Sequence, residues 1–174
     1  TIPSHRSYYP DATNTTLLVE KGPGRLGPYT ASPAIYRCPA DSSYILLSGQ
    51  RHQRVRSYAI NEYMNPVYGV AQWTPEQEVQ HKLGDFRSLP ACEGWVFGDE
   101  HEDSINDGTF EVNYKPISFD EMPTSRHGNS GTFSFADGHA ELHRWLDIRT
   151  IQPGTHASAG AQLIGVVSPN NRDN

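Results

Sequence analysis

Basic residues, cysteines and long apolar runs are all scarce in this chain of 174 residues. Its 14 lysines and arginines are outnumbered by 20 aspartates and glutamates, and the net charge of -6 argues against a nucleic-acid-binding surface. No run approaches the roughly 18 apolar residues of a membrane-spanning helix. Residues 1–10 contain no initiator methionine and no signal peptide, so we expect either a mature product or a shortened chain.

The sequence also lacks the short motifs of the common enzyme classes. It has no G-x-S-x-G nucleophile turn, no phosphate-binding glycine loop and no zinc signature. Aromatic residues nevertheless make up 10% of the chain, which is untypical of a disordered protein, and 15 glycines with 13 prolines indicate long ordered loops. We therefore expect a folded, loop-rich domain without an evident catalytic motif.

Proline spacing and apolar alternation divide the chain into three parts. Residues 1–34 are expected to be irregular, because prolines at positions 3, 10, 23, 28 and 33 interrupt any helix. Residues 35–150 contain the predicted strands, among them residues 54–63 and 94–98. Residues 151–174 are expected to form an irregular tail. The predicted fold class is α+β, with a globular domain dominated by an antiparallel β-sheet and long loops.

The strongest local signal is a β-hairpin towards the C-terminal end. Residues 132–136 and 139–145 alternate apolar and polar side chains, and Asp137-Gly138 between them is typical of a two-residue type I′ turn. We expect one face of this hairpin to enter the core. The candidates for that face are Phe133, Phe135, Ala140, Leu142 and Trp145.

Cys38 and Cys92 are the two cysteines of the chain. An even pair without the spacing of a metal site predicts one disulfide, which would close a loop of about 55 residues. Such a bond implies an extracytoplasmic compartment. The alternative is two buried free thiols in a cytosolic protein.

An acidic stretch at residues 98–108 suggests a cation site. Asp103, Asn106 and Asp107 are candidate ligands of a loose calcium loop, although Ile105 and Tyr114 stand where an EF-hand has ligands. Calcium is therefore a candidate cofactor, and no cofactor is certain. The alternative is a solvated acidic turn without an ion.

A second candidate cluster consists of His127, Asp137 and His139. If the chain folds back at this point, we expect a charge-assisted hydrogen bond between His127 and Asp137. The same three residues, with Asp99 as a fourth ligand, are also a candidate metal site.

Two further interpretations concern polysaccharides. Asp99, Glu100 and His127 are candidates for the acid, base or nucleophile of a glycoside hydrolase-like enzyme, because paired carboxylates carry out that chemistry. Trp73 and Trp95 are candidate stacking residues of a carbohydrate-binding module without turnover. Neither the enzyme nor the module has a specific motif, and we expect the chain not to be an enzyme.

Several segments in a fixed order resemble one bacterial family, the prepilin-type, type II secretion pseudopilin-like proteins of the H-x(9)-D-G group. The pattern itself is His127, nine residues and then Asp137-Gly138. The other matching segments are YRCPAD at residues 36–41, RSYAIN at residues 56–61, residues 99–108 and residues 133–145. The resemblance runs from about Tyr36 to Asp147, roughly two-thirds of the chain, and the order of the segments is more specific than any single segment.

This resemblance implies a structural or assembly subunit with a pilin-like globular domain. Such proteins begin with a hydrophobic helix that lies in the inner membrane and later packs in a filament, and the chain as given does not contain it. Residues 1–34 would follow that helix, and membrane contact would occur only through it. The implied partners are other pilin-like subunits or secretion-system components, outside the cytoplasm. Major pseudopilins hold calcium in a C-terminal loop, which by analogy supports a cation near residues 103–107.

Overall fold

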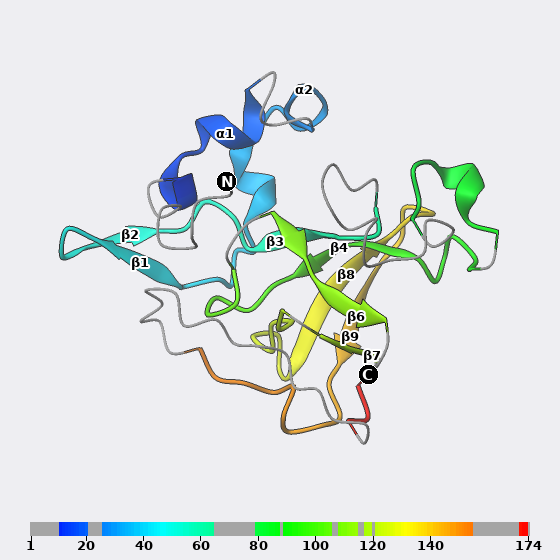
Figure 1. The fold of residues 1–174 in the computed structure, drawn as a ribbon. Helices are drawn as coiled ribbons and strands as arrows, with labels where there is room; N and C mark the ends of the chain where they lie inside the picture. Colours follow the sequence, from blue (N-terminus) through cyan, green and yellow to red (C-terminus); the bar gives the residue numbers. More distant parts are fainter. Residues whose placement is uncertain are drawn as a thin grey trace.

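The computed structural model describes residues 11–20, 26–64, 79–87, 89–105, 108–114, 117–119, 121–154 and 171–173. Within this part of the chain the protein is rich in sheet and has few, short helices, which confirms the expected α+β class in its coarse form. A five-stranded sheet in the order β5-β3-β4-β8-β9 forms its centre (Figure 1). Its strands are β3 (Tyr58–Asn61), β4 (Trp95–Asp99), β5 (Thr109–Phe110), β8 (Ser130–Phe135) and β9 (Ala140–Arg144).

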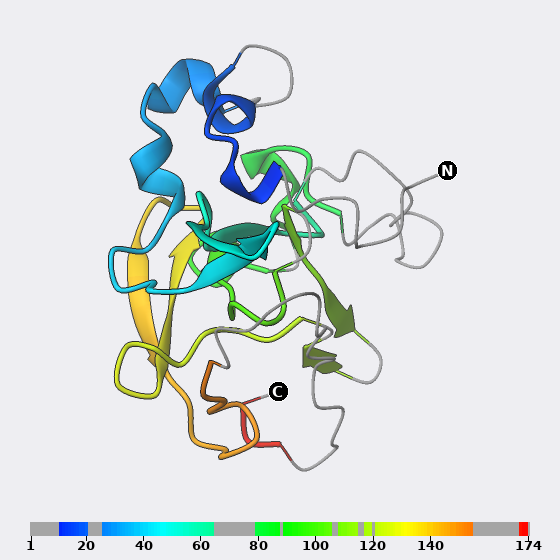
Figure 2. The same ribbon diagram turned by 90° about the vertical axis from the view of Figure 1, so that its left-hand side faces the viewer.

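Short helical turns precede the sheet in the chain. They are η2 (Asp11–Thr13), α1 (Thr16–Val19), α2 (Gly27–Thr30) and η3 (Pro33–Tyr36), and Figure 2 shows them gathered at one end of the molecule. Pro28 and Pro33 lie in the first turns of α2 and η3, where a missing N–H breaks no hydrogen bond. A further turn, η6 (Leu83–Asp85), precedes β4. None of the described helices has the length and apolarity needed to cross a membrane.

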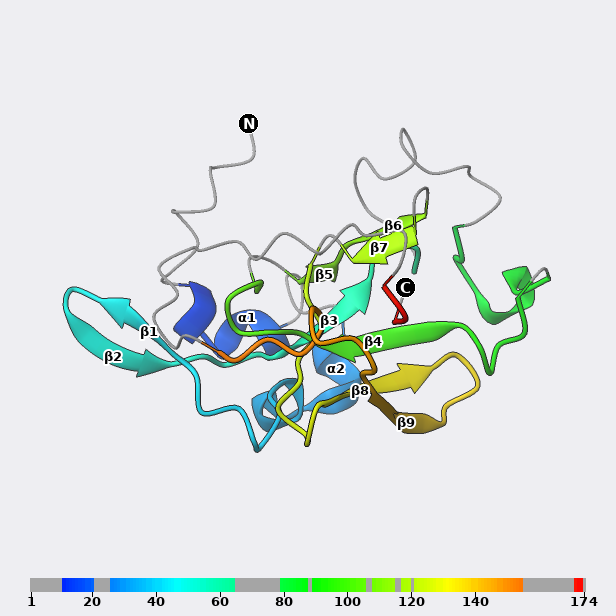
Figure 3. The ribbon, with the colours of Figure 1, turned by 90° about the horizontal axis from the view of Figure 1, so that it is seen from below.

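Two small hairpins flank the central sheet: β1 (Tyr44–Leu47) with β2 (Gln50–Gln53), and β6 (Val112–Tyr114) with β7 (Ile117–Phe119). The β1–β2 hairpin projects away from the five-stranded sheet (Figure 3). Its two-residue loop, Ser48-Gly49, has φ angles of 51° and 80°, so the type I′ turn occurs here. The Ser-Gly dipeptide was the available sequence signal for this hairpin.

The predicted hairpin between β8 and β9 is present, but its turn is not type I′. Gly138 has a φ of 93°, whereas Asp137 does not have a positive φ. The Gly138 N–H donates to the Phe135 carbonyl and the Phe135 N–H donates to the His139 carbonyl, both at 2.9 Å. The loop therefore has three residues, a type I turn followed by a left-handed glycine.

This extra loop residue decides which side chains of β9 face the core. Phe133 pairs with Glu141, so Leu142 lies on the opposite face of the sheet from Phe133. A one-residue change of register reverses the faces of a strand, and every residue of β9 is exposed. The prediction that Ala140 and Leu142 are core residues is therefore wrong, and Phe135 is only half-buried. Phe133 and Trp145 are buried as predicted.

The core centres on aromatic side chains that contact one another edge to face in a closed ring. Neighbouring ring centroids lie between 5.3 and 6.0 Å apart, a favourable arrangement for aromatic pairs. Gly131 allows this packing, because a Cβ atom there would lie 2.9 Å from the Trp145 ring. In order around the ring, the residues are Trp95, Phe110, Phe119, Trp145 and Phe133.

Candidate functional site

A buried polar cluster lies where three segments that are distant in the sequence meet. Asp99 ends β4, Cys38 follows η3, and Arg126 and His127 lie in the turn before β8. Because β3, β4 and β8 are neighbours in the sheet, these segments meet at one end of the central strands. The Cys38 N–H donates to the Ser57 hydroxyl at 2.7 Å, which fixes the cysteine beside the start of β3.

Asp99 is the centre of this polar cluster. Its Oδ1 accepts a hydrogen bond from Arg126 at 2.7 Å, and its Oδ2 lies 3.1 Å from His127 Nε2. The residue is completely buried. Burial raises the pKa of Asp99 above its ordinary value, although Arg126 and His127 act in the opposite direction.

Arg126 connects Asp99 to further carboxylates. It donates to Glu102 at 3.1 Å and lies 4.0 Å from Asp41. It also donates to the Glu100 carbonyl at 3.2 Å. Burial lowers the pKa of Arg126, but the three carboxylates raise it more, so the guanidinium stays charged and joins three acidic side chains.

A polar pocket with a volume of about 230 Å³ lies against Arg126. Its charged groups are Arg126, Asp41 and Glu102, and Ser42 and Ser125 contribute hydroxyls. Neither Asp99 nor the other two candidates for acid–base catalysis line this pocket.

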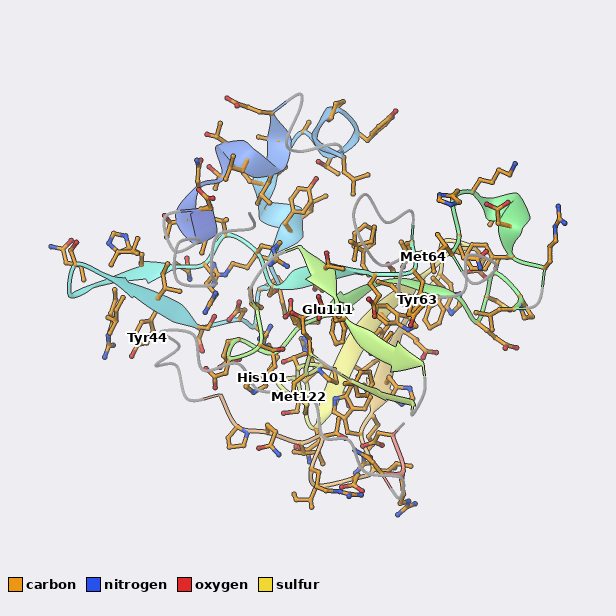
Figure 4. All side chains as sticks on the ribbon, in the orientation of Figure 1. Tyr44, Tyr63, Met64, His101, Glu111 and Met122 are labelled. Atoms are coloured by element: carbon orange, nitrogen blue, oxygen red, sulfur yellow. The ribbon has the colours of Figure 1, made fainter. Side chains whose placement is uncertain are left out.

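The part of the acidic stretch from Asp99 to Ser104 is buried, so the expectation of a solvated turn is wrong for these residues. Its residues from 99 to 103 are at most 6% exposed. The Asp103 N–H donates to His101 Nδ1 at 3.1 Å, so Nε2 carries the proton and donates to the Gln152 carbonyl at 3.1 Å. His101 and Met122 lie side by side in Figure 4, and the His101 N–H donates to the Met122 carbonyl. Asn106 and Asp107 lie outside the described residues, and the calcium loop remains a prediction.

The two carboxylates of the hydrolase interpretation lie in different surroundings. Successive residues of an extended chain point to opposite sides, so Glu100 does not share the environment of Asp99. Glu100 lies 3.7 Å from Arg56, and both carboxylates are completely buried. Of the two candidate stacking residues, Trp95 packs in the aromatic core, and Trp73 lies outside the described residues.

The predicted disulfide between Cys38 and Cys92 is not formed, and both residues are free thiols. Cys38 lies beside the Asp99 end of β4, whereas Cys92 precedes the Trp95 end. The length of β4 separates them by roughly 13 Å, and a disulfide needs Cα atoms within about 7 Å. The prediction of an extracytoplasmic location is therefore not supported by a disulfide.

His127, Asp137 and His139 do not come together, so both expectations for this cluster are wrong. His127 precedes β8 and Asp137 follows it, and the strand separates them by roughly 17 Å. Asp137 instead contacts His139 at 2.6 Å in the exposed hairpin turn. Hydrogen bonds from the His139 backbone and ring lower the pKa of Asp137. His127 contacts Asp99, the residue proposed as a fourth ligand, and Cys38.

Sequence patterns did not single out Arg126, Asp41 or Tyr58 as site residues. Each of the three lies within or next to a sequence segment that resembles the family. That position was the one sequence signal that could have indicated them as site residues. Burial, followed by the electrostatic effects of Asp99 and Cys38, raises the pKa of Tyr58 to about 12, so its hydroxyl is protonated and hydrogen-bonds to Cys38.

The chain matches no protein-family model, no curated protein sequence and no solved structure. The resemblance to the pseudopilin-like proteins therefore stays a prediction from the sequence segments.

Proposed function

We propose that this chain is the globular domain of a pseudopilin-like assembly subunit from a type II secretion or type IV pilus-like system. On this proposal it acts outside the cytoplasm, in contact with other pilin-like subunits or secretion components. Its fold would be a pilin-like domain whose sheet packs on an N-terminal membrane helix of the whole protein.

The observation that carries this proposal is the exposed edge of the central sheet. Strand β9 is the last in the order of the sheet, and all five of its residues are exposed. An edge strand offers its backbone N–H and C=O groups to a neighbouring chain. Three large apolar side chains on β9 and just after it, Leu142, Leu146 and Ile148, are 59%, 56% and 75% exposed. Exposed apolar side chains on and just after an edge strand favour a role in protein–protein contact.

The positions of the family segments give a second line of support. The segment at residues 36–41 contributes Cys38 and Asp41, and the segment at residues 56–61 contains β3. The later segments contribute Asp99 and the β8–β9 hairpin. Segments that were chosen for their sequence alone therefore lie close together in the fold. This favours a structural origin shared with the pseudopilin-like proteins.

The burial of the candidate acids favours an assembly subunit over a hydrolase. A glycosidase holds its two carboxylates on either side of a substrate that enters from solvent. Asp99 and Glu100 are 0% exposed, and the ion pairs with Arg126 and Arg56 hold them on different sides of the chain.

Fractionation of the full-length protein in its own bacterium tests the proposal. We expect a leader upstream of Thr1 that prepilin peptidase removes, and a processed protein that stays in the membrane fraction after alkaline extraction. We also expect it to copurify with defined pilin-like subunits after cross-linking. A cleavable secretory signal and a freely secreted product would contradict the proposal.

A further inference from the structure

Three ligand-type side chains converge on one point of the polar cluster. One ligand atom from each of Cys38, Asp99 and His127 lies within 4.8 Å of the other two. The Nε2 atom is 3.3 Å from the sulfur and 3.1 Å from the carboxylate oxygen. We propose that these three atoms bind one divalent metal ion of the zinc class. This inference does not depend on the proposed assembly function.

The distances fit a tetrahedral ion. At bond lengths of about 2.0 Å to nitrogen and oxygen and about 2.3 Å to sulfur, tetrahedral ligand atoms lie roughly 3.3 Å (N···O) and roughly 3.5 Å (S···N) apart. The observed separations are 3.1 and 3.3 Å, so adjustments of a few tenths of an ångström would accommodate the ion. The third pair, sulfur and oxygen, lies within the same 4.8 Å limit.

Hydrogen bonding alone accounts less well for this arrangement. A histidine Nε2 has either one N–H or one lone pair, directed along a single line in the ring plane. Here the same nitrogen faces both Cys38 and Asp99. A hydrolytic Cys-His-Asp triad uses both ring nitrogens, the carboxylate on one and the sulfur on the other. A metal ion on the lone-pair axis of Nε2 would bond to all three groups at once.

Outer contacts hold each ligand in place before any ion binds. Arg126 binds Asp99 through Oδ1, so Oδ2 remains directed at the converging point. The Ser57 hydroxyl holds the Cys38 backbone, and the Tyr58 hydroxyl hydrogen-bonds to the Cys38 side chain. Such outer-shell contacts orient the ligands of metal sites and tune their basicity. Arg126 also contacts Asp41 and Glu102, so its positive charge is shared among three carboxylates.

The donor set selects the class of metal. A thiolate with an imidazole suits zinc and other late first-row ions, whereas calcium and magnesium prefer oxygen ligands. Cys38 and Asp99 are buried, and the His127 side chain is 24% exposed. A fourth ligand, a water molecule, would therefore approach from the His127 side. On binding, the ion replaces the thiol proton of Cys38, which passes to solvent.

Cobalt(II) and zinc titrations of the purified chain test this proposal. Cys92 is exposed and supplies a competing thiol, so the reference protein is Cys92→Ser. We expect one Co²⁺ per chain, with the thiolate charge-transfer band and the intense visible bands of a tetrahedral ion, and displacement by Zn²⁺. Calcium should not displace the cobalt. Absence of these bands from Cys92→Ser would overturn the proposal, whether or not any further variant folds.

Variants then assign the ligands. In the Cys92→Ser background, Cys38→Ser should lose the charge-transfer band, and His127→Gln should weaken binding at least tenfold. His139→Gln is the matched control, because this histidine is exposed and pairs with Asp137. Tyr58→Phe should lower zinc affinity roughly 10- to 100-fold, the usual effect of losing an outer-shell contact. Retention of the band in folded Cys38→Ser, or equal losses in His127→Gln and His139→Gln, would contradict the assignment.

Discussion

His127 Nε2 lies 3.1 Å from Asp99 Oδ2, although the two residues are 28 positions apart in the chain. Arg126, the neighbour of His127, binds the other oxygen of the same carboxylate. A single turn before β8 therefore holds both oxygens of the residue that ends β4. This contact joins two strands of the sheet through buried polar groups, and its loss should affect the stability of the whole domain.

The Arg126→Gln variant should measure that effect. Removal of the guanidinium leaves Asp99 and Glu102 without this partner in a buried setting, and breaking a buried ion pair costs about 3–5 kcal/mol of unfolding free energy. Arg144→Gln, on the exposed strand β9, is the control and should stay within about 0.5 kcal/mol. Urea unfolding compares the two, and equal stabilities would show that Arg126 does not hold the cluster together.

Loss of an aromatic side chain should be equally severe. Phe110 is 0% exposed and contacts both Trp95 and Phe119, so Phe110→Ala should lower the unfolding free energy by about 3–5 kcal/mol. Tyr29→Ala is the control, because Tyr29 is 86% exposed and should change stability by less than about 0.5 kcal/mol. If Phe110→Ala were as stable as the control, the cluster of five aromatic side chains would not be the core of the fold.

In the metal-free protein, the Tyr58 hydroxyl should lose its proton at a higher pH than that of an ordinary tyrosine. Burial, Asp99 and Cys38 raise its pKa to about 12, whereas a tyrosine of the unfolded chain titrates near 10. Between these values the unfolded chain loses the proton and the folded chain keeps it, so this group makes stability fall as the pH rises. Ultraviolet titration should show a late phase that Tyr58→Phe abolishes. A late phase that persists in Tyr58→Phe would assign it to another residue.

The elements that could be predicted from the sequence are those with a local signal. The alternation around Asp137-Gly138 indicated the β8–β9 hairpin. The predicted strand at residues 54–63 contains β3, and the one at residues 94–98 overlaps β4 except for its last residue, Asp99. The length of the hairpin loop was not predictable, because Asp-Gly also fits a three-residue loop with a left-handed glycine. That single residue changed the register and placed Leu142 on the exposed face.

The polar cluster could not be predicted from local patterns, since its members come from distant segments. Cys38 and His127 are 89 positions apart, and their proximity depends on the order of strands in the sheet. The spacing of the H-x(9)-D-G pattern has a simple structural explanation in this chain. Strand β8 and its flanking turns occupy the interval, so the histidine belongs to the polar cluster and the Asp-Gly pair to the hairpin.

Photo-cross-linking from β9 in the assembled full-length protein tests the proposed function most directly. A photoreactive amino acid at Leu142, on the exposed edge, should cross-link to a defined pilin-like subunit or to a second copy of this chain. The same group at Leu83 in η6, which is 63% exposed, should give few such products. Equal cross-linking at both positions, or none from Leu142 in cells that assemble the system, would contradict the role of this edge in assembly.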